Sequence, residues 1–198
     1  METEELRGIA RFIIEAFTLK VLPRTGWFRV GVSPSKVESV ADHTFVTAII
    51  AVLLAEEENA NPFRCCTMAT LHDIGESRTG DIARPLARLL ENLGVKKIEI
   101  DQAAEEKQRA GLPSSAKNLL EELLKEYHEN TTIESKVVHD AMIIEQGIQA
   151  LFYRKEGYDT AEFIKEIELR IVTQSAKALW AVLLQNPEEL IWWKEEQE

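Results

Sequence analysis

The sequence predicts an all-α fold, and two observations support this prediction. Helix breakers are few, since the 198 residues include only 9 glycines and 6 prolines, whereas 45% of the residues are hydrophobic. Apolar residues recur three and four positions apart in one segment after another, and no stretch alternates as a half-buried strand does. With no break in composition, we expect one compact domain over residues 1–198, with a core of about residues 20–155 and terminal helices packed on it.

Helix start signals place the elements of the first half. The first helix is expected at about residues 3–19, where the apolar residues share one face, and a loop rich in breakers follows it. A second helix begins at Ser39, because an aspartate three residues later completes a capping-box pattern. Asn61 followed by Pro62 is a further start signal, which predicts a third helix that continues to about residue 77.

Caps and breakers also divide the second half. The segment Thr79-Gly80-Asp81 ends the third helix, and Asp81 can cap the next one. Thr132 is the expected cap of a long helix, and Asp159 or Thr160 caps the one after it. Together these signals predict helices at about residues 82–92, 97–110, 114–128, 132–155 and 160–185, with a short terminal helix after Asn186-Pro187.

Charge and cysteine content restrict the partners and the compartment. The formal net charge of −11 argues against nucleic acid or an anionic membrane as the main partner, although a small phosphorylated substrate remains compatible with it. Cys65 and Cys66, the only cysteines, are adjacent, so a disulfide between them is sterically unfavourable, which suits a reducing compartment. The N-terminus lacks the pattern of a signal peptide, and no apolar run has the length of a membrane span. We therefore expect a cytoplasmic protein.

Three side chains that handle protons or metals fall within one and a half helical turns. Residues three or four apart share a helix face, so Glu76 is expected to stack on both His72 and Asp73. Cys65 and Met68 continue the stripe of His72, which directs that histidine toward the interior. This combination indicates a divalent metal.

Two more polar residues lie on apolar stripes of other helices. His43 shares a face with Val46 and Ile50, and Asp140 shares one with Ile144. A lone histidine on such a stripe is more often hydrogen-bonded core, and a lone aspartate can accept bonds from a cap or an arginine. Burial of an unpaired carboxylate is costly, however, and the combination across three helices favours a mixed nitrogen–oxygen metal site. Because His128 and His139 are the only other histidines, we expect one metal rather than two.

This ordered set of motifs resembles the HD-domain superfamily of metal-dependent phosphohydrolases and, within it, the single-domain 5′-deoxynucleotidases. The resemblance covers most of the chain, through Pro23-Arg24-Thr25-Gly26-Trp27, Ala41-Asp42-His43, Leu71-His72-Asp73-Ile74-Gly75-Glu76, Thr79-Gly80-Asp81-Ile82 and Asp140. It implies one divalent ion, of manganese, cobalt, zinc, iron or magnesium, held by His43, His72, Asp73 and Asp140. It also implies catalytic roles for Glu76 and Asp81, and substrate-binding roles for Arg24 and Trp27.

The activity that the resemblance implies is hydrolysis of deoxynucleoside 5′-monophosphates to deoxynucleoside and phosphate. Arg24 would bind the phosphate and Trp27 the sugar, while either Glu76 or Asp81 would orient water or protonate the leaving oxygen. Without the resemblance, a plain helix cap is an alternative role for Asp81. Arg24 alone is more often a solvated loop residue, and Trp27 alone would be core.

Two other classes of function stay open at this point. One is a different HD-domain activity, such as a cyclic-nucleotide phosphodiesterase, a nucleotide pyrophosphohydrolase or a di-iron oxygenase, although some of these need more ligands. The other is a non-catalytic helical interaction module. The resemblance also suggests a homodimer. Trp192 and Trp193 near the acidic C-terminus are candidates for its interface, and the alternative is that at least one of them packs against the domain.

Overall fold

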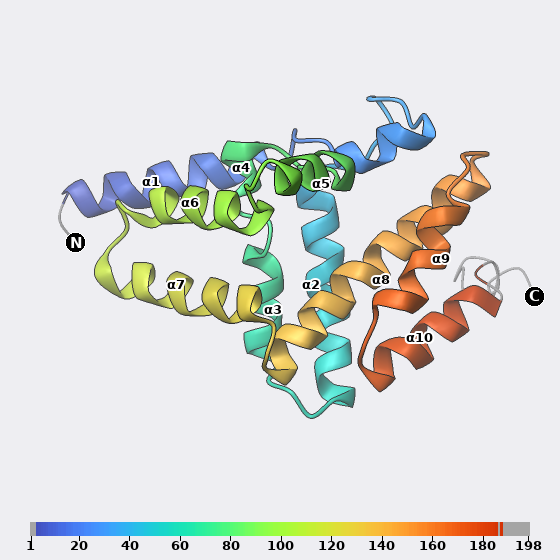
Figure 1. Ribbon diagram of the computed structural model, residues 1–198. Helices are drawn as coiled ribbons and strands as arrows, with labels where there is room; N and C mark the ends of the chain where they lie inside the picture. The colour runs from blue at the N-terminus through green and yellow to red at the C-terminus, as the bar shows by residue number, and fades with distance from the viewer. Residues whose placement is uncertain (1–2, 186, 188–198) are drawn as a thin grey trace, which may run out of the picture.

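The computed structural model describes residues 3–185 and 187, and the described chain is all-α, as the sequence predicts (Figure 1). An isolated bridge between Pro23 and Ser39 is the one extended pairing within these residues. The elements are α1 (Thr3–Thr18), the 3-10 helix η1 (Thr25–Val30), α2 (Val40–Glu57), α3 (Pro62–Leu71), α4 (Glu76–Thr79), α5 (Arg84–Asn92), α6 (Lys97–Arg109), α7 (Ser114–Glu129), α8 (Ile133–Lys155), α9 (Ala161–Arg170) and α10 (Gln174–Gln185).

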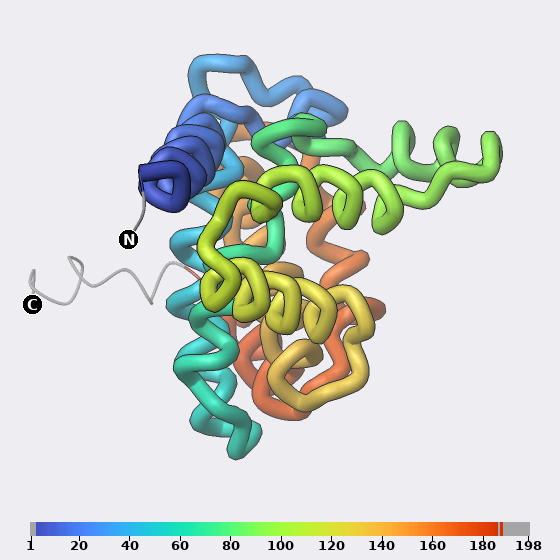
Figure 2. The backbone as a smooth tube through the Cα atoms, turned by 90° about the vertical axis from the view of Figure 1, so that its left-hand side faces the viewer, coloured from blue at the N-terminus to red at the C-terminus, as the bar shows by residue number. Residues whose placement is uncertain are grey.

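Helices α2, α3 and α8 form the centre of the molecule, where α2 packs against both of the others. Helices α6 and α7 lie on one side of this centre, and α9 and α10 lie on the other (Figure 1). Figure 2 shows that α5 projects outward from the body, above α7. None of the described residues of α5 is buried.

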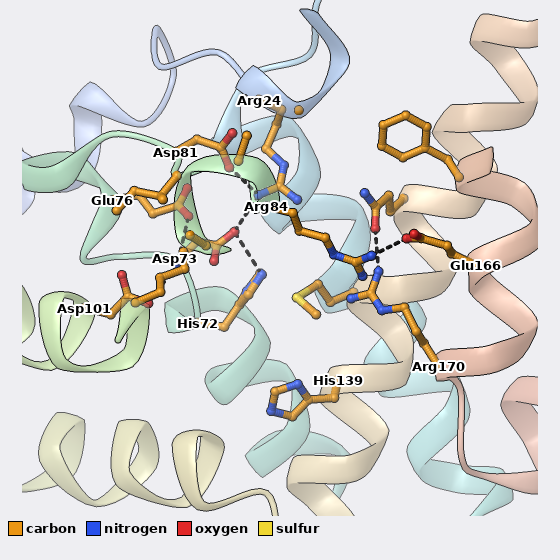
Figure 3. Close-up of a pocket in the computed structure, with 18 of the residues that line it drawn as sticks. Arg24, His72, Asp73, Glu76, Asp81, Arg84, Asp101, His139, Glu166 and Arg170 are labelled. Carbon is orange, nitrogen blue, oxygen red and sulfur yellow. Dashed lines mark hydrogen bonds and ion pairs between the residues drawn. The ribbon is translucent and has the colours of Figure 1, made fainter. Parts of the chain in front are cut away.

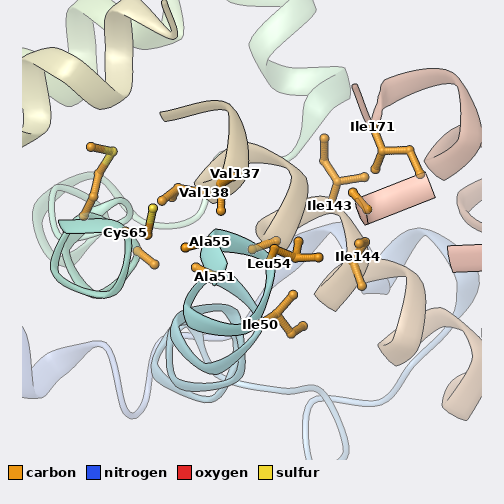
Figure 4. Packing of buried hydrophobic residues seen from close by; sticks show 14 of the residues in the cluster. Ile50, Ala51, Leu54, Ala55, Cys65, Val137, Val138, Ile143, Ile144 and Ile171 are labelled. Carbon is orange, nitrogen blue, oxygen red and sulfur yellow. The ribbon is translucent and has the colours of Figure 1, made fainter. Parts of the chain in front are cut away.

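The main hydrophobic core lies between α2, α3, α8 and α10 (Figure 4). Ala51 of α2, Cys65 of α3 and Val138 of α8 are fully buried at the crossing of these helices. Small side chains at the crossing let the helix axes approach closely, which brings polar residues on the same helices near one another. The core therefore fixes the relative positions of α2, α3 and α8.

A glycine permits the contact between α8 and α10. A Cβ atom added at Gly147 would lie 2.6 Å from the ring of Trp180, which is itself buried. Real side chains do not approach so closely, so this crossing requires glycine at position 147.

The predicted start signals are present as hydrogen bonds. Ser39 Oγ accepts from the Asp42 backbone N–H at 3.1 Å, and Asp42 Oδ2 accepts from the Ser39 N–H at 2.9 Å, which completes the capping box. Asn61 Oδ1 caps α3, and Thr132 Oγ1 caps α8.

The prediction of an uninterrupted third helix to residue 77 is wrong. Helix α3 ends at Leu71, and residues 72–75 form turns before α4 begins. The backbone N–H groups of Ile74 and Glu76 bond to the carbonyls three residues before them, at 3.0 Å each. Such bonds are tighter than those of an α-helix and rotate successive side chains by about 120°. His72 and Asp73 thus belong to a tightened turn.

The prediction of one helix from about residue 160 to 185 is also wrong. Helix α9 ends at Arg170, and Ile171 is extended, with φ −71° and ψ 137°, before α10 begins at Gln174. The predicted terminal helix and the two tryptophans at positions 192 and 193 lie outside the described residues. Within the described part of the chain, no helix combines the length and apolar character needed to cross a membrane.

Candidate metal centre and its cavity

Donor atoms from α2 and from the turn after α3 converge at one point. Nε2 of His43 lies 3.3 Å from Nε2 of His72, and Oδ2 of Asp73 lies 3.2 Å from the latter and 3.8 Å from the former. All three side chains are buried. Two nitrogens and one oxygen at these separations match ligands of a single cation.

The hydrogen bonds of the two histidines engage Nδ1 of each ring and leave both Nε2 atoms facing the other donors. Nδ1 of His72 donates to the carbonyl of Ala69 at 2.6 Å, and Nδ1 of His43 donates to the carboxylate of Glu145. In a neutral imidazole the other nitrogen is then an acceptor. Burial, aided by Arg24, holds the pKa of His43 well below its ordinary value, so this ring is neutral. Because Nδ1 of each ring is engaged as a donor, Nε2 of a neutral ring can offer its lone pair to a divalent cation.

Glu145 and Glu38 lie on the opposite side of His43 from the other donors. Burial raises the pKa of each to about 7. Glu38 also accepts a hydrogen bond from Nε1 of Trp27 at 2.6 Å. The sequence reasoning missed Glu145, although its position four residues after Ala141 places a carboxylate on the buried stripe of α8, which was the available signal.

Arg24 supplies positive charge beside the donor atoms. Its Nη1 lies 3.2 Å from Asp73 Oδ2 and 3.1 Å from Asp81 Oδ1. Burial alone would lower the pKa of Arg24, but the charges of Asp73 and Asp81 raise it above its ordinary value. A permanently charged guanidinium therefore faces the same space as the metal donors.

Asp81 is not a helix cap. Ala83 occupies the N-cap position of α5, and Asp81 Oδ2 instead accepts from the backbone N–H and the hydroxyl of Thr25, at 2.6 Å each. Its other oxygen bonds Arg24. Asp81 therefore fixes the start of η1 and the direction of Arg24.

Glu76 is buried and has little compensation for its charge. Burial, followed by the charge of Asp73, raises its pKa to about 9. Lys97 Nζ lies 3.5 Å from Oε1, and Oε2 has no hydrogen-bond partner among the described residues. The environment of this carboxyl group therefore favours its protonated form.

The structure does not bring Asp140 to the donor atoms. Its carboxylate accepts from the backbone N–H groups of Val172 and Thr173, at 3.0 Å and 2.7 Å, and from the Thr173 hydroxyl at 2.7 Å. The expectation that it is the fourth ligand is therefore wrong for this arrangement. It is buried, as its stripe predicts, but against the α9–α10 connection, where backbone donors satisfy its charge.

A cavity of about 380 Å³ opens from the donor atoms toward α9 (Figure 3). Its walls carry side chains that the sequence reasoning did not select: Arg84, Lys97, Asp101, Gln146, Glu166 and Arg170. No sequence signal distinguishes these from ordinary charged residues on amphipathic helices. Helix α8 faces the cavity with His139, Met142 and Gln146, none of which is a carboxylate.

The two remaining histidines and Trp27 also line the cavity. His128 Nε2 lies 2.9 Å from Glu105, and the His139 ring stacks on Tyr127 with 4.4 Å between ring centroids. Trp27 is buried and packs on Phe163 at 4.7 Å. Each therefore has a packing role beside any contact it makes with a ligand.

The helical fold and the donor set of two histidines and an aspartate define the class, a metal-dependent phosphohydrolase with an HD motif. The chain belongs to the HD domain family, whose model matches residues 16–181.

Curated relatives and solved structures agree with this assignment. The chain is 34% identical over 149 residues to 5'-deoxynucleotidase HDDC2 of Xenopus laevis, which covers 75% of this chain and 71% of the relative. The human protein of the same name is 31% identical over 147 residues, with 74% and 69% covered. A conserved hypothetical protein from Pyrococcus furiosus superposes with a TM-score of 0.70 at 26% identity, covering 89% of this chain and 99% of that one. A Pyrococcus horikoshii structure has a TM-score of 0.71 at 27% identity, with 88% and 95% covered.

Proposed function

We propose that this protein is a 5′-deoxynucleotidase, which uses a divalent metal to hydrolyse deoxynucleoside 5′-monophosphates to deoxynucleoside and phosphate. The observation that carries the proposal is the convergence of two histidine nitrogens and an aspartate oxygen beside a buried arginine. The activity named for relatives with 31–34% identity supports the same conclusion.

His43, His72 and Asp73 would hold the ion. When bound, a divalent ion supplies Lewis-acid chemistry, since it neutralises phosphoryl oxygens and lowers the pKa of coordinated water. The three donors fit manganese, cobalt, iron or zinc, which accept imidazole together with carboxylate, and magnesium is a weaker match.

Arg24 would bind the phosphate of the substrate. A guanidinium presents paired N–H donors that match two phosphoryl oxygens, and its charge persists at every physiological pH. Asp81 would act as a positioning residue, because it bonds both Arg24 and the backbone of Thr25. The two carboxylates that the sequence left interchangeable thus receive different roles.

Glu76 would be the general acid. Burial of its side chain favours the protonated carboxyl group, and this proton would move to the 5′ oxygen as the phosphorus–oxygen bond breaks. Lys97, at 3.5 Å, then stabilises the carboxylate that remains.

Selectivity for deoxyribose would come from Trp27. Its ring is held by the bond from Nε1 to Glu38 and by packing on Phe163, and it lines the cavity next to Arg24. A fixed aromatic face supports apolar contact with an unsubstituted 2′ carbon and disfavours a 2′ hydroxyl.

The decisive experiment is a panel of ribonucleoside and deoxynucleoside monophosphates, assayed for phosphate release with several divalent metals after chelation. We expect deoxynucleotides to be hydrolysed at least tenfold faster than the corresponding ribonucleotides. Absence of phosphate release from every member, with each metal, would overturn the proposal. Equal rates for dAMP and AMP would remove the deoxy preference alone.

A cytoplasmic homodimer of single HD domains is part of the same proposal. Support comes from apolar side chains that α1 and α2 leave exposed, namely Ile13, Ile14, Phe17, Phe45, Ile49 and Leu53. Exposed apolar faces of this kind are typical of protein interfaces. Light scattering of the wild type and of Phe45→Glu tests it, and a monomeric wild type would contradict it.

A further inference from the structure

The end of the cavity farthest from the metal donors carries a polar wall. We define this distal wall by Arg84 at the start of α5, Gln146 on α8, and Glu166 and Arg170 on α9, all of which line the cavity. Figure 3 shows the guanidinium groups of Arg84 and Arg170 side by side, with Glu166 next to them. The proposed mechanism at the metal end uses none of these residues.

The two arginines differ in their partners. The guanidinium of Arg84 pairs with the carboxylate of Glu166, whereas Nη1 of Arg170 donates to the amide oxygen of Gln146 at 3.0 Å. A guanidinium has five N–H donors, so each arginine retains donors for a ligand. Burial, followed by the nearby charge of Arg84, lowers the pKa of Arg170 to about 10, so an added acceptor beside it is favourable.

The mixture of charges restricts the ligand chemistry. Two guanidiniums supply donors, and Glu166 supplies acceptors within the same wall. A second phosphate or a carboxylate of the substrate would bond the guanidiniums, but it would compete with Glu166 for Arg84 and leave the acceptors of Glu166 without a donor. A neutral group with acceptors on one edge and donors on the adjacent edge would satisfy both signs.

Guanine has this arrangement among the nucleic-acid bases. Its O6 and N7 accept from a guanidinium, and its N1–H and 2-amino groups donate to a carboxylate. Adenine places an amino group where guanine has O6, so it would direct a donor at an arginine. Cytosine and thymine present a smaller edge that reaches fewer of the four side chains.

We propose that the distal wall is a base-recognition site for guanine, which makes deoxyguanosine 5′-monophosphate the preferred substrate. This inference rests on the proposed nucleotidase function, because the phosphate must lie at Arg24 for the base to extend toward α9. A cavity of about 380 Å³ is within the range that holds a small-molecule ligand.

Steady-state kinetics on the wild type and on Arg170→Met provides the first test. We expect kcat/KM for dGMP to exceed that for dAMP by about 10–100-fold, the range for a site that bonds groups its competitor lacks. Arg170→Met should reduce kcat/KM for dGMP by at least about tenfold and leave dCMP unchanged. Arg88→Met is the matched control, since Arg88 lies exposed one turn after Arg84 on α5 and does not line the cavity. It should behave as wild type.

Calorimetric binding of deoxyguanosine and deoxyadenosine, which lack the phosphate, provides a test that needs no turnover. Tighter binding of deoxyguanosine supports guanine recognition by the distal wall, and equal binding overturns it.

The outcomes for the two proposals can be told apart. If all deoxynucleotides are hydrolysed at equal rates, the base preference fails while the nucleotidase function stands. If deoxyguanosine binds selectively but no monophosphate is hydrolysed, guanine recognition by the distal wall is supported and the proposed function fails. A thermal unfolding curve shows whether Arg170→Met folds, and Gln146→Leu, which removes the amide from the same wall, repeats the test if it does not.

Discussion

The two ends of the cavity are built from different parts of the fold. At the metal end the side chains of His43 and His72 are fully buried, and they come from α2 and from the turn after α3, which flank the main core. At the distal wall the side chains of Arg84 and Glu166 are 41% and 34% exposed, and they come from the peripheral helices α5 and α9. The residues proposed to bind the metal thus lie in the packed interior. The residues proposed to recognise the base lie on peripheral helices and are partly exposed.

This contrast has an energetic basis. Displacing a buried donor requires the core to move, and close-packed interiors resist such displacement. A half-exposed ion pair, by comparison, contributes less than about 1 kcal/mol to stability and tolerates replacement. We therefore expect substitutions at the metal end to abolish activity, and those at the distal wall to change preference.

The largest effect is expected for Asp73→Ala. Loss of this oxygen removes one of three donors and leaves Arg24 without a partner there, so metal content and turnover should both fall, turnover by at least about 10³-fold. Elemental analysis and phosphate release measure the two. Asp159→Ala, at an exposed position in the connection before α9, is the control, and normal activity of the Asp73 variant would contradict the site.

Glu76→Gln should come next. The amide keeps the shape of the side chain and cannot transfer the proton, so kcat should fall by about 10²–10⁴-fold while metal content stays at the wild-type level. The ratio of kcat to bound metal separates this effect from loss of the ion. Retention of kcat would remove Glu76 from the mechanism.

Glu145→Gln tests the layer behind the donors. Without the carboxylate, the orientation of the His43 ring is less well defined, and metal affinity should fall by about 10–100-fold. Competition with a chelator gives the affinity, and Glu168→Gln on the surface of α9 is the control. Unchanged affinity would show that packing alone orients His43.

Asp140→Asn distinguishes a structural role of this carboxylate from a role as a metal ligand. An amide oxygen cannot replace both carboxylate oxygens toward Val172 and Thr173, so the free energy of unfolding should fall by about 1–3 kcal/mol. Metal affinity of the folded variant should be unchanged. A large loss of affinity with little loss of stability would restore Asp140 as a ligand.

The smallest effect is expected for Glu166→Gln. Its pairing with Arg84 is half exposed, so the free energy of unfolding should change by less than about 1 kcal/mol. Chemical denaturation measures it. A change of several kcal/mol would mean that the distal wall is as much a part of the core as the metal end.

Local rules predicted most of the elements of this fold, because capping residues and breakers act over a few positions. Ser39, Asn61 and Thr132 each begin a helix where the sequence indicated. The tightened turn at residues 72–75 was missed because its first and last residues keep helical backbone angles. His72 has φ −58° and ψ −32°, and Gly75 has φ −59° and ψ −28°. Only the bonding pattern distinguishes this turn from a helix.

The site was partly predictable for a related reason. A stripe shows which residues face inward but not which neighbour they meet, and α8 is buried on several sides. Asp140 faces the α9–α10 connection, while His139 and Met142 face the cavity. Contacts such as that of Glu145 with His43, 102 positions apart in the chain, depend on helix packing that no local pattern encodes.

The hydrogen bonds that Asp140 accepts also affect the distance between the two ends of the cavity. Asp140 binds the backbone at Val172, two residues after Arg170, and lies on the same helix as Gln146, the partner of Arg170. Backbone hydrogen bonds to one carboxylate thus hold the chain just after Arg170 against α8. A substitution that moved this corner by one ångström would alter the size of molecule that fits between the two ends while every group at the reacting centre stayed in place.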